Sequence, residues 1–90
     1  MAYRSMLRKR IDSNHTPIVA ALRATGALVQ SLATIGGGCA DLLVLHRGKL
    51  SLLEIKTLKG KVRADQAKRM AEGWPVQVVR SVDEAIAAVS

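Results

Sequence analysis

Two carboxylates and a lysine lie at the ends of two apolar segments, where charged side chains are unusual. Asp41 opens the segment that runs to Leu45, and Glu54 and Lys56 follow the apolar residues that begin at Leu50. Mg²⁺ prefers oxygen ligands and typically takes one or two carboxylates beside its bound waters. Such a metal lowers the pKa of a bound water and stabilises charge on a phosphoryl group, and a lysine beside it can orient the attacking water. These residue types therefore fit metal-assisted phosphodiester hydrolysis.

The spacing of the two segments predicts that the acids meet. Arg47-Gly48 between them is typical of a two-residue hairpin turn, and this register places Asp41 opposite Glu54. Opposed residues have Cβ atoms about 5 Å apart, so two like charges there need a cation. Lys56, two residues after Glu54, points to the same face. A turn of another length would separate the acids, and Glu-x-Lys alone is often only a solvated ion pair at a strand end.

The remaining pattern predicts a single α/β domain over residues 14–90, preceded by a basic arm over residues 1–13. Thr16 and Pro17 are typical of a helix start, and Ser81 with Glu84 forms a capping box for a last helix. Both hairpin strands are apolar on both faces, which favours a mixed sheet covered by helices on each side. In chain order the expected elements are a helix over 14–26, strands over 27–32, 41–45 and 50–55, a helix over 64–72, a strand over 76–79 and a helix ending near Val89.

The charge balance indicates a polyanionic partner. The chain carries 14 Lys and Arg against 7 Asp and Glu, a formal net charge of +7, and a domain this basic attracts nucleic acid. An anionic membrane surface is the alternative, but no helix opposes a large apolar face to a Lys/Arg face. With no Phe, one Trp and one Tyr, recognition is expected to rest on backbone and shape. The residues expected to contact phosphates are Arg8, Lys9, Arg10, Lys59, Lys61, Arg63, Lys68 and Arg69.

Cysteine usage and apolar segment lengths exclude several other classes. With Cys39 as its single cysteine, the chain has no internal disulfide and no zinc-ligand motif, which fits a reducing cytosol. No segment approaches the length of a membrane span. Gly36-Gly37-Gly38 lacks the Gly-Lys-Ser/Thr of a nucleotide-binding loop, so a tight turn is the better interpretation. A core this small also favours support from a partner subunit.

The strings Gly36-Gly37-Gly38-Cys39-Ala40-Asp41-Leu42-Leu43-Val44 and Leu53-Glu54-Ile55-Lys56 resemble the PD-(D/E)XK nuclease superfamily, and specifically the stand-alone VRR-NUC domains of phages and bacteria. The resemblance runs from about Asn14 to the C-terminus. It implies a restriction-endonuclease-like αβββαβ core with a C-terminal helix. It also implies a Mg²⁺- or Mn²⁺-dependent endonuclease that acts as a homodimer on branched DNA such as Holliday junctions, in the cytosol of the phage's host or the bacterium.

The resemblance also implies roles for single residues. Asp41 and Glu54 are metal ligands together with the Ile55 carbonyl, Lys56 is the catalytic lysine, and Gln66 is an auxiliary active-site residue. One feature departs from the family, because residues 14–25 contain no acid where its members often carry one. A non-catalytic DNA-binding module of the same fold therefore remains an alternative, and an interaction subunit that docks on an acidic protein is a third.

Overall fold

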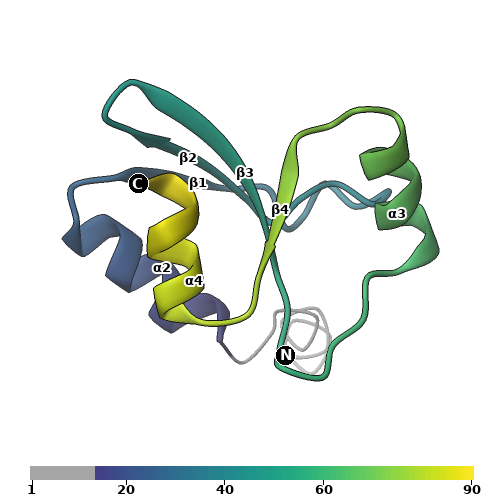
Figure 1. The fold of residues 1–90 in the computed structure, drawn as a ribbon, viewed down its shortest axis with the longest axis horizontal. Coiled ribbons are helices and arrows are strands. Elements are labelled where there is room, and N and C mark those ends of the chain that lie inside the picture. Colours follow the sequence, from purple (N-terminus) through teal and green to yellow (C-terminus); the bar gives the residue numbers. More distant parts are fainter. Residues whose placement is uncertain (1–13) are drawn as a thin grey trace, which may run out of the picture.

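The computed structural model of this 90-residue chain describes residues 14–90. Its elements are α2 (His15–Ala24), β1 (Leu28–Ser31), β2 (Leu42–His46), β3 (Lys49–Ile55), α3 (Ala64–Ala71), β4 (Val76–Val79) and α4 (Val82–Val89). The strands form one sheet in the order β1-β2-β3-β4, in which only the β3–β4 pair is parallel. Figure 1 shows α2 and α4 side by side, with α3 on the far side of β4. The predicted α/β class, mixed sheet and element order are confirmed.

The hairpin has the predicted turn. Arg47 and Gly48 both have positive φ, 53° and 77°, the pattern of the type I′ turn that follows the twist of a two-residue hairpin. The ladder runs from His46↔Lys49 to Leu42↔Leu53. The predicted register is therefore confirmed over the whole of β2. Asp41 directly precedes β2 and lies outside this ladder.

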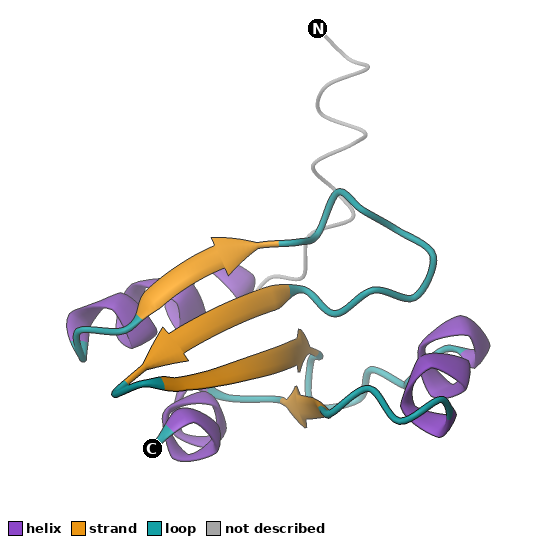
Figure 2. Cartoon of the chain, turned by 90° about the horizontal axis from the view of Figure 1, so that it is seen from above, coloured by secondary structure: helices purple, strands orange, loops and turns teal. Residues whose placement is uncertain are grey.

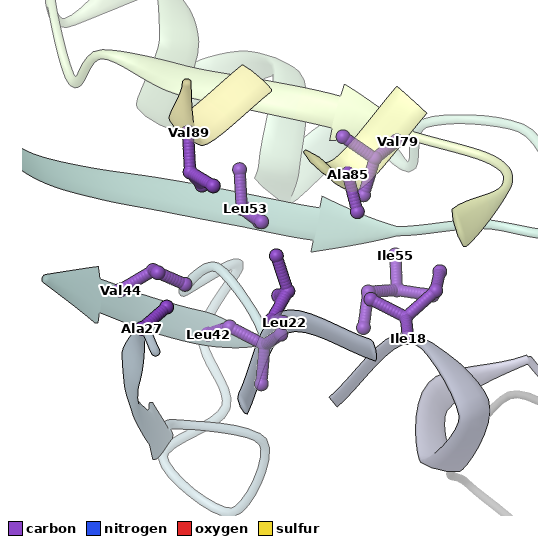
Figure 3. Packing of buried hydrophobic residues seen from close by; sticks show 10 residues of the cluster. All are labelled: Ile18, Leu22, Ala27, Leu42, Val44, Leu53, Ile55, Val79, Ala85 and Val89. Carbon is purple, nitrogen blue, oxygen red and sulfur yellow. The ribbon is translucent and has the colours of Figure 1, made fainter. Parts of the chain in front are cut away.

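The core lies between the sheet and the layer formed by α2 and α4. Side chains alternate along a strand, so every second residue of β2 and β3 faces these helices. Figure 3 shows the buried side chains of the strands in contact with those of α2 and α4. The cluster consists of Ile18, Leu22, Ala27, Leu42, Val44, Leu53, Ile55, Val79, Ala85 and Val89.

The prediction that helices cover both faces of the sheet is wrong for residues 14–90. Helix α4 packs on β2, β3 and β4, and α2 packs on α4 and β1, so both lie on one face. Figure 2 shows α3 beyond the end of the strands and not over them. The opposite face keeps exposed leucines, among them Leu28 and Leu50 at 68% and 64% exposure. The apolar residues on this second face predict a helix layer, but within the described chain the leucines there remain exposed.

The start of α2 differs from the predicted one, whereas the start of α4 agrees with it. Helix α2 begins at His15 with Asn14 as its N-cap residue, whereas Thr16 was expected to cap it. The Asn14 side chain makes no capping bond: its Nδ2 donates to the carbonyl oxygen of Lys56, and its Oδ1 is buried without a hydrogen-bond partner. Ser81 caps α4 as predicted, its hydroxyl accepting from the Glu84 amide at 3.1 Å.

Ser51 gives a stability prediction for this fold. It lies opposite Val44 in the hairpin, is 5% exposed, and its hydroxyl has no hydrogen-bond partner. An unpaired buried hydroxyl costs about 1–3 kcal/mol, so Ser51→Ala is expected to raise the free energy of unfolding by about 1 kcal/mol. Urea denaturation followed by circular dichroism measures it. A loss of 1 kcal/mol or more would show that the hydroxyl stabilises the hairpin.

Candidate functional site

The site forms where β2 begins and β3 ends. Asp41 lies just before the ladder and contacts β3 on both sides of Glu54. Its amide donates to the Leu53 carbonyl at 3.0 Å, and its Oδ2 accepts from the Ile55 amide at 2.8 Å. The carboxylate thus takes the place of a strand carbonyl as the acceptor for Ile55. This bond fixes the Asp41 side chain beside the end of β3.

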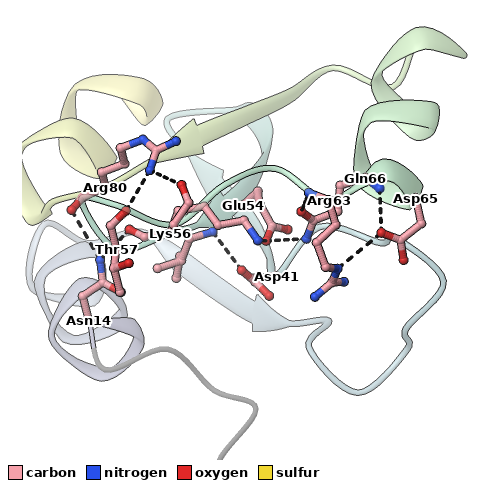
Figure 4. A network of polar contacts seen from close by, with 11 residues as sticks. Asn14, Asp41, Glu54, Lys56, Thr57, Arg63, Asp65, Gln66 and Arg80 are labelled. Carbon is pink, nitrogen blue, oxygen red and sulfur yellow. Dashed lines mark hydrogen bonds and ion pairs between the residues drawn. The ribbon is translucent and has the colours of Figure 1, made fainter.

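Glu54 is the centre of the polar cluster. It is 3% exposed, and its Oε2 accepts from Gln66 Nε2 at 2.7 Å and lies 3.2 Å from Lys56 Nζ. Its other oxygen, Oε1, is buried without a hydrogen-bond partner. Figure 4 shows Asp41, Glu54, Lys56 and Gln66 converging on this spot. One carboxylate oxygen is therefore saturated by donors, while the other is buried with none.

Burial and the second acid change the charge state of Glu54. Burial, followed by the nearby charge of Asp41, raises the pKa of the Glu54 carboxyl from 4.5 to about 7, against the opposing effects of Lys56 and Gln66. The lysine therefore does not fully compensate for the two acids. A cation bound between them would lower this pKa again, because it favours the ionised form.

Gln66 is held in one orientation by two bonds. While its Nε2 donates to Glu54, its Oε1 accepts from the Arg63 amide at 3.0 Å, as part of the capping box that starts α3. Its side chain is buried. Gln66 thus joins the start of α3 to the Glu54 carboxylate on β3.

The glycine loop positions this helix. All three glycines have positive φ, and a Cβ on Gly38 would lie 2.5 Å from the Asp65 carbonyl oxygen and 3.1 Å from the Gln66 amide nitrogen. Arg69 adds a second link from α3, its Nε donating to the Gly37 carbonyl at 3.1 Å. The predicted tight turn accounts for these glycines, and the close approach to α3 gives a further reason for Gly38.

Sequence reasoning missed two residues that hold the backbone around Lys56. Asn14 Nδ2 donates to the Lys56 carbonyl at 2.9 Å and lies 3.4 Å from that of Arg80. The Arg80 guanidinium donates to the carbonyls of Thr57 at 2.7 Å and Gly60 at 2.6 Å, in the loop that follows Lys56. An Asn at a helix start is a recognisable signal. Nothing in the sequence points to Arg80, because its contacts are made with backbone far along the chain.

The expected phosphate contacts are only partly accessible. Lys59, Lys61 and Lys68 are exposed, Arg63 is exposed but pairs with Asp65 at 3.3 Å, and Arg69 is engaged with Gly37. The predicted basic arm with Arg8, Lys9 and Arg10 lies outside the described residues. No helix in the described part of the chain is long and apolar enough to cross a membrane.

The site offers few metal ligands. Within residues 14–90 no group of three or more His, Cys, Asp or Glu side chains comes together, so Asp41 and Glu54 stand as a pair. A pair still fits Mg²⁺ or Mn²⁺, since such ions keep several waters, and the unpaired Glu54 Oε1 is a suitable oxygen. Comparison of the chain with protein-family models, with curated proteins and with solved structures finds no match.

The close approach of Gly38 to α3 predicts unequal effects of two similar substitutions. Gly36 and Gly38 have φ values of 77° and 80°, so an alanine at either is strained, but only at Gly38 would the new Cβ meet backbone. We expect Gly36→Ala to cost about 1–2 kcal/mol of unfolding free energy and Gly38→Ala clearly more, as measured by urea denaturation. Equal losses would contradict the role of Gly38 in seating α3.

The pKa of Glu54 predicts a pH dependence of stability. Between pH 4.5 and about 7 the folded chain retains a proton that the unfolded chain has released, so the free energy of unfolding falls as pH rises through this window. We expect a loss of about 2–3 kcal/mol from this group in metal-free buffer. Denaturation of wild type and Glu54→Gln at pH 5, 6, 7 and 8 isolates it, and identical pH profiles would refute it.

Proposed function

We propose that this chain is a divalent-metal-dependent endonuclease that hydrolyses phosphodiester bonds in DNA. The observation that carries the proposal is the arrangement around Glu54: a buried carboxylate with one unpaired oxygen, beside Asp41 and in contact with Lys56. The net charge of +7 supports a nucleic-acid substrate. The resemblance to PD-(D/E)XK enzymes supports a restriction-endonuclease-like fold and branched DNA, such as Holliday junctions, as the substrate.

Asp41 and Glu54 would hold a Mg²⁺ or Mn²⁺ ion, with the Ile55 carbonyl as a further ligand. When bound, the ion supplies Lewis acidity toward a phosphate oxygen and toward a water. Gln66 keeps the Glu54 side chain in place through its 2.7 Å bond, which leaves the unpaired oxygen free for another contact. Fixed ligands of this kind require little rearrangement during reaction.

Lys56 has a separate role in the proposal. Its Nζ lies 3.2 Å from Glu54 Oε2 and its side chain is 10% exposed. A compact ammonium group at this position can donate to an attacking water and stabilise the charge that develops on the phosphate. The exposed Lys59 and Lys61 in the following loop would attract the backbone of the same DNA strand.

Lys56→Ala is expected to separate chemistry from binding. On a branched DNA substrate with Mg²⁺, we expect the single-turnover rate at saturating protein to fall by about 10²-fold or more, because the ammonium group acts in the transition state. Lys59→Ala is the matched control. It should keep the saturated rate, and only weaken DNA binding with a slightly smaller salt dependence. No cleavage by wild type, or equal rates for wild type and Lys56→Ala, would sink the proposal.

One observation favours a second candidate, a non-catalytic DNA-binding module. Helix α2 has no acid in its first turn, and Asn14 at its start faces the Lys56 carbonyl with its amide nitrogen. The acids would then have a structural role only.

Asp41→Asn distinguishes the two functions. A nuclease is expected to retain DNA affinity within about threefold and to lose cleavage by about 10²-fold or more, since the carboxylate contributes to the metal site and not to phosphate attraction. Gel-shift titration and a cleavage time course on the same substrate measure both quantities. Salt-sensitive binding without metal-dependent cleavage by wild type would instead establish the binding module.

A further inference from the structure

The face of the sheet opposite α2 and α4, here called the outer face, is mainly apolar, with Gln30 on β1 and Glu54 at the end of β3 as its polar residues. Along each strand the residues that alternate with the core residues point to it. Three of its leucines stand well exposed, Leu28 at 68%, Leu50 at 64% and Leu45 at 42%. The outward residues are Leu28, Gln30, Leu43, Leu45, Leu50, Leu52, Val76 and Val78. Single exposed leucines are ordinary, but a contiguous apolar face marks an interaction surface.

A hollow continues this face toward α3. It has a volume of about 260 Å³, and it is lined by Leu52 and Val76 of the outer face together with Ile35, Arg69 and Trp74. Trp74 is 51% exposed and Ile35 64% exposed. The Arg69 guanidinium lies 5.8 Å from the centre of the Trp74 ring. Trp and Arg around a pocket are the residue types that most often dominate the energy of a protein interface.

The charge distribution favours an apolar occupant over DNA on the part of this face that precedes Glu54. The chain has a net charge of +7, yet the outward residues of all four strands are uncharged up to Glu54, at the end of β3. Phosphate backbones bind where cations are. An apolar surface on a basic protein instead suits a second apolar surface, and an uncharged face lets two basic copies meet without juxtaposing their charges.

We propose that the outer face is the interface of a homodimer of this chain. The face is self-complementary, since its exposed leucines lie at the hairpin end and its hollow lies at the opposite end, beside α3. A two-fold axis lying in the interface and across the strands places the leucines of each copy over the hollow of the other. Each contact then occurs twice, as an isologous interface requires.

The strands supply part of the area that a dimer interface needs. Four strands about 4.8 Å apart, of four, five, seven and four residues, give a plan area of roughly 300 Å². The protruding side chains and the hollow with Ile35 and Trp74 add accessible surface to this plan area. A standard interface buries ~800 Å² of accessible surface per partner.

The dimer deepens the proposed function, although its evidence does not depend on nuclease activity. Glu54 follows Leu52 by two residues on the same face of β3, so the partner copy would border the carboxylate pair. The two-fold axis across the strands would set two such sites at opposite ends of the interface. Two sites are what symmetric cleavage of a four-way junction needs.

Sedimentation equilibrium of the full chain at 5–100 μM without DNA or metal, in about 0.5 M NaCl, tests the proposal. We expect wild type at twice its 9.7 kDa. Leu28→Lys with Leu50→Lys should raise the dimer dissociation constant more than about 100-fold, because charges would enter an apolar interface. Leu58→Lys is the matched control: Leu58 is 80% exposed but lies in the loop after β3, so this variant should remain a dimer.

Each result decides between an interface and an unpaired surface. A wild-type monomer at all concentrations from 5 to 100 μM overturns the proposal. The face would then be covered by another protein or by another segment of the same chain, or remain exposed. Dissociation by Leu58→Lys, or dimers of undiminished affinity in the double lysine variant, shows that a different surface pairs the copies. Circular dichroism establishes that each variant is folded. Because DNA and metal are absent, failure here leaves the cleavage experiment on Lys56 unaffected.

Discussion

The burial of the Glu54 carboxylate is the constraint around which the site is arranged. A carboxylate at the end of an inner strand is costly to ionise unless opposite charge or donors compensate for lost hydration. Lys56 and Gln66 provide two donors, but both act on Oε2. Because Asp41 is fixed nearby by the Ile55 amide, it adds a second negative charge. The raised pKa of Glu54, about 7, reflects the compensation that is still missing.

The elements that converge on this carboxylate come from distant parts of the chain. The β2–β3 hairpin places Asp41 beside Glu54, α3 provides Gln66, and the glycine loop allows α3 to approach closely at Gly38. On the other side, Asn14 and Arg80 bind the carbonyls of Lys56 and of the loop after it. The polar network thus lies where β2 begins and β3 ends, in a sheet whose core face is covered by α2 and α4. Strand β3 therefore contributes to both, since Leu53 and Ile55 lie in the core and Glu54 between them lies in the site.

Local signals predicted the hairpin correctly from Leu42 to Leu53, because a two-residue turn fixes the register. The predicted opposition of Asp41 and Glu54 lies one residue outside this ladder, where the Asp41 amide donates to the Leu53 carbonyl. The last helix was equally readable from Ser81 and Glu84. The sequence could not show that one sheet face would lack a helix layer, since an apolar residue such as Leu50 is compatible with a helix or with a partner subunit. The contacts of Arg80 and Gly38 were also unpredictable, because they join backbone groups that only tertiary folding brings together.

Manganese binding to the DNA-free protein tests most directly whether the Asp41–Glu54 pair is a metal site. Electron paramagnetic resonance of a Mn²⁺ titration at pH 8, where Glu54 is largely ionised, counts the bound ions. One bound ion per chain is predicted, with the site lost in Glu54→Gln and Asp41→Asn and affinity falling as pH drops below about 7. No binding by wild type, or unchanged binding in both variants, would contradict the assignment of this pair as the metal centre.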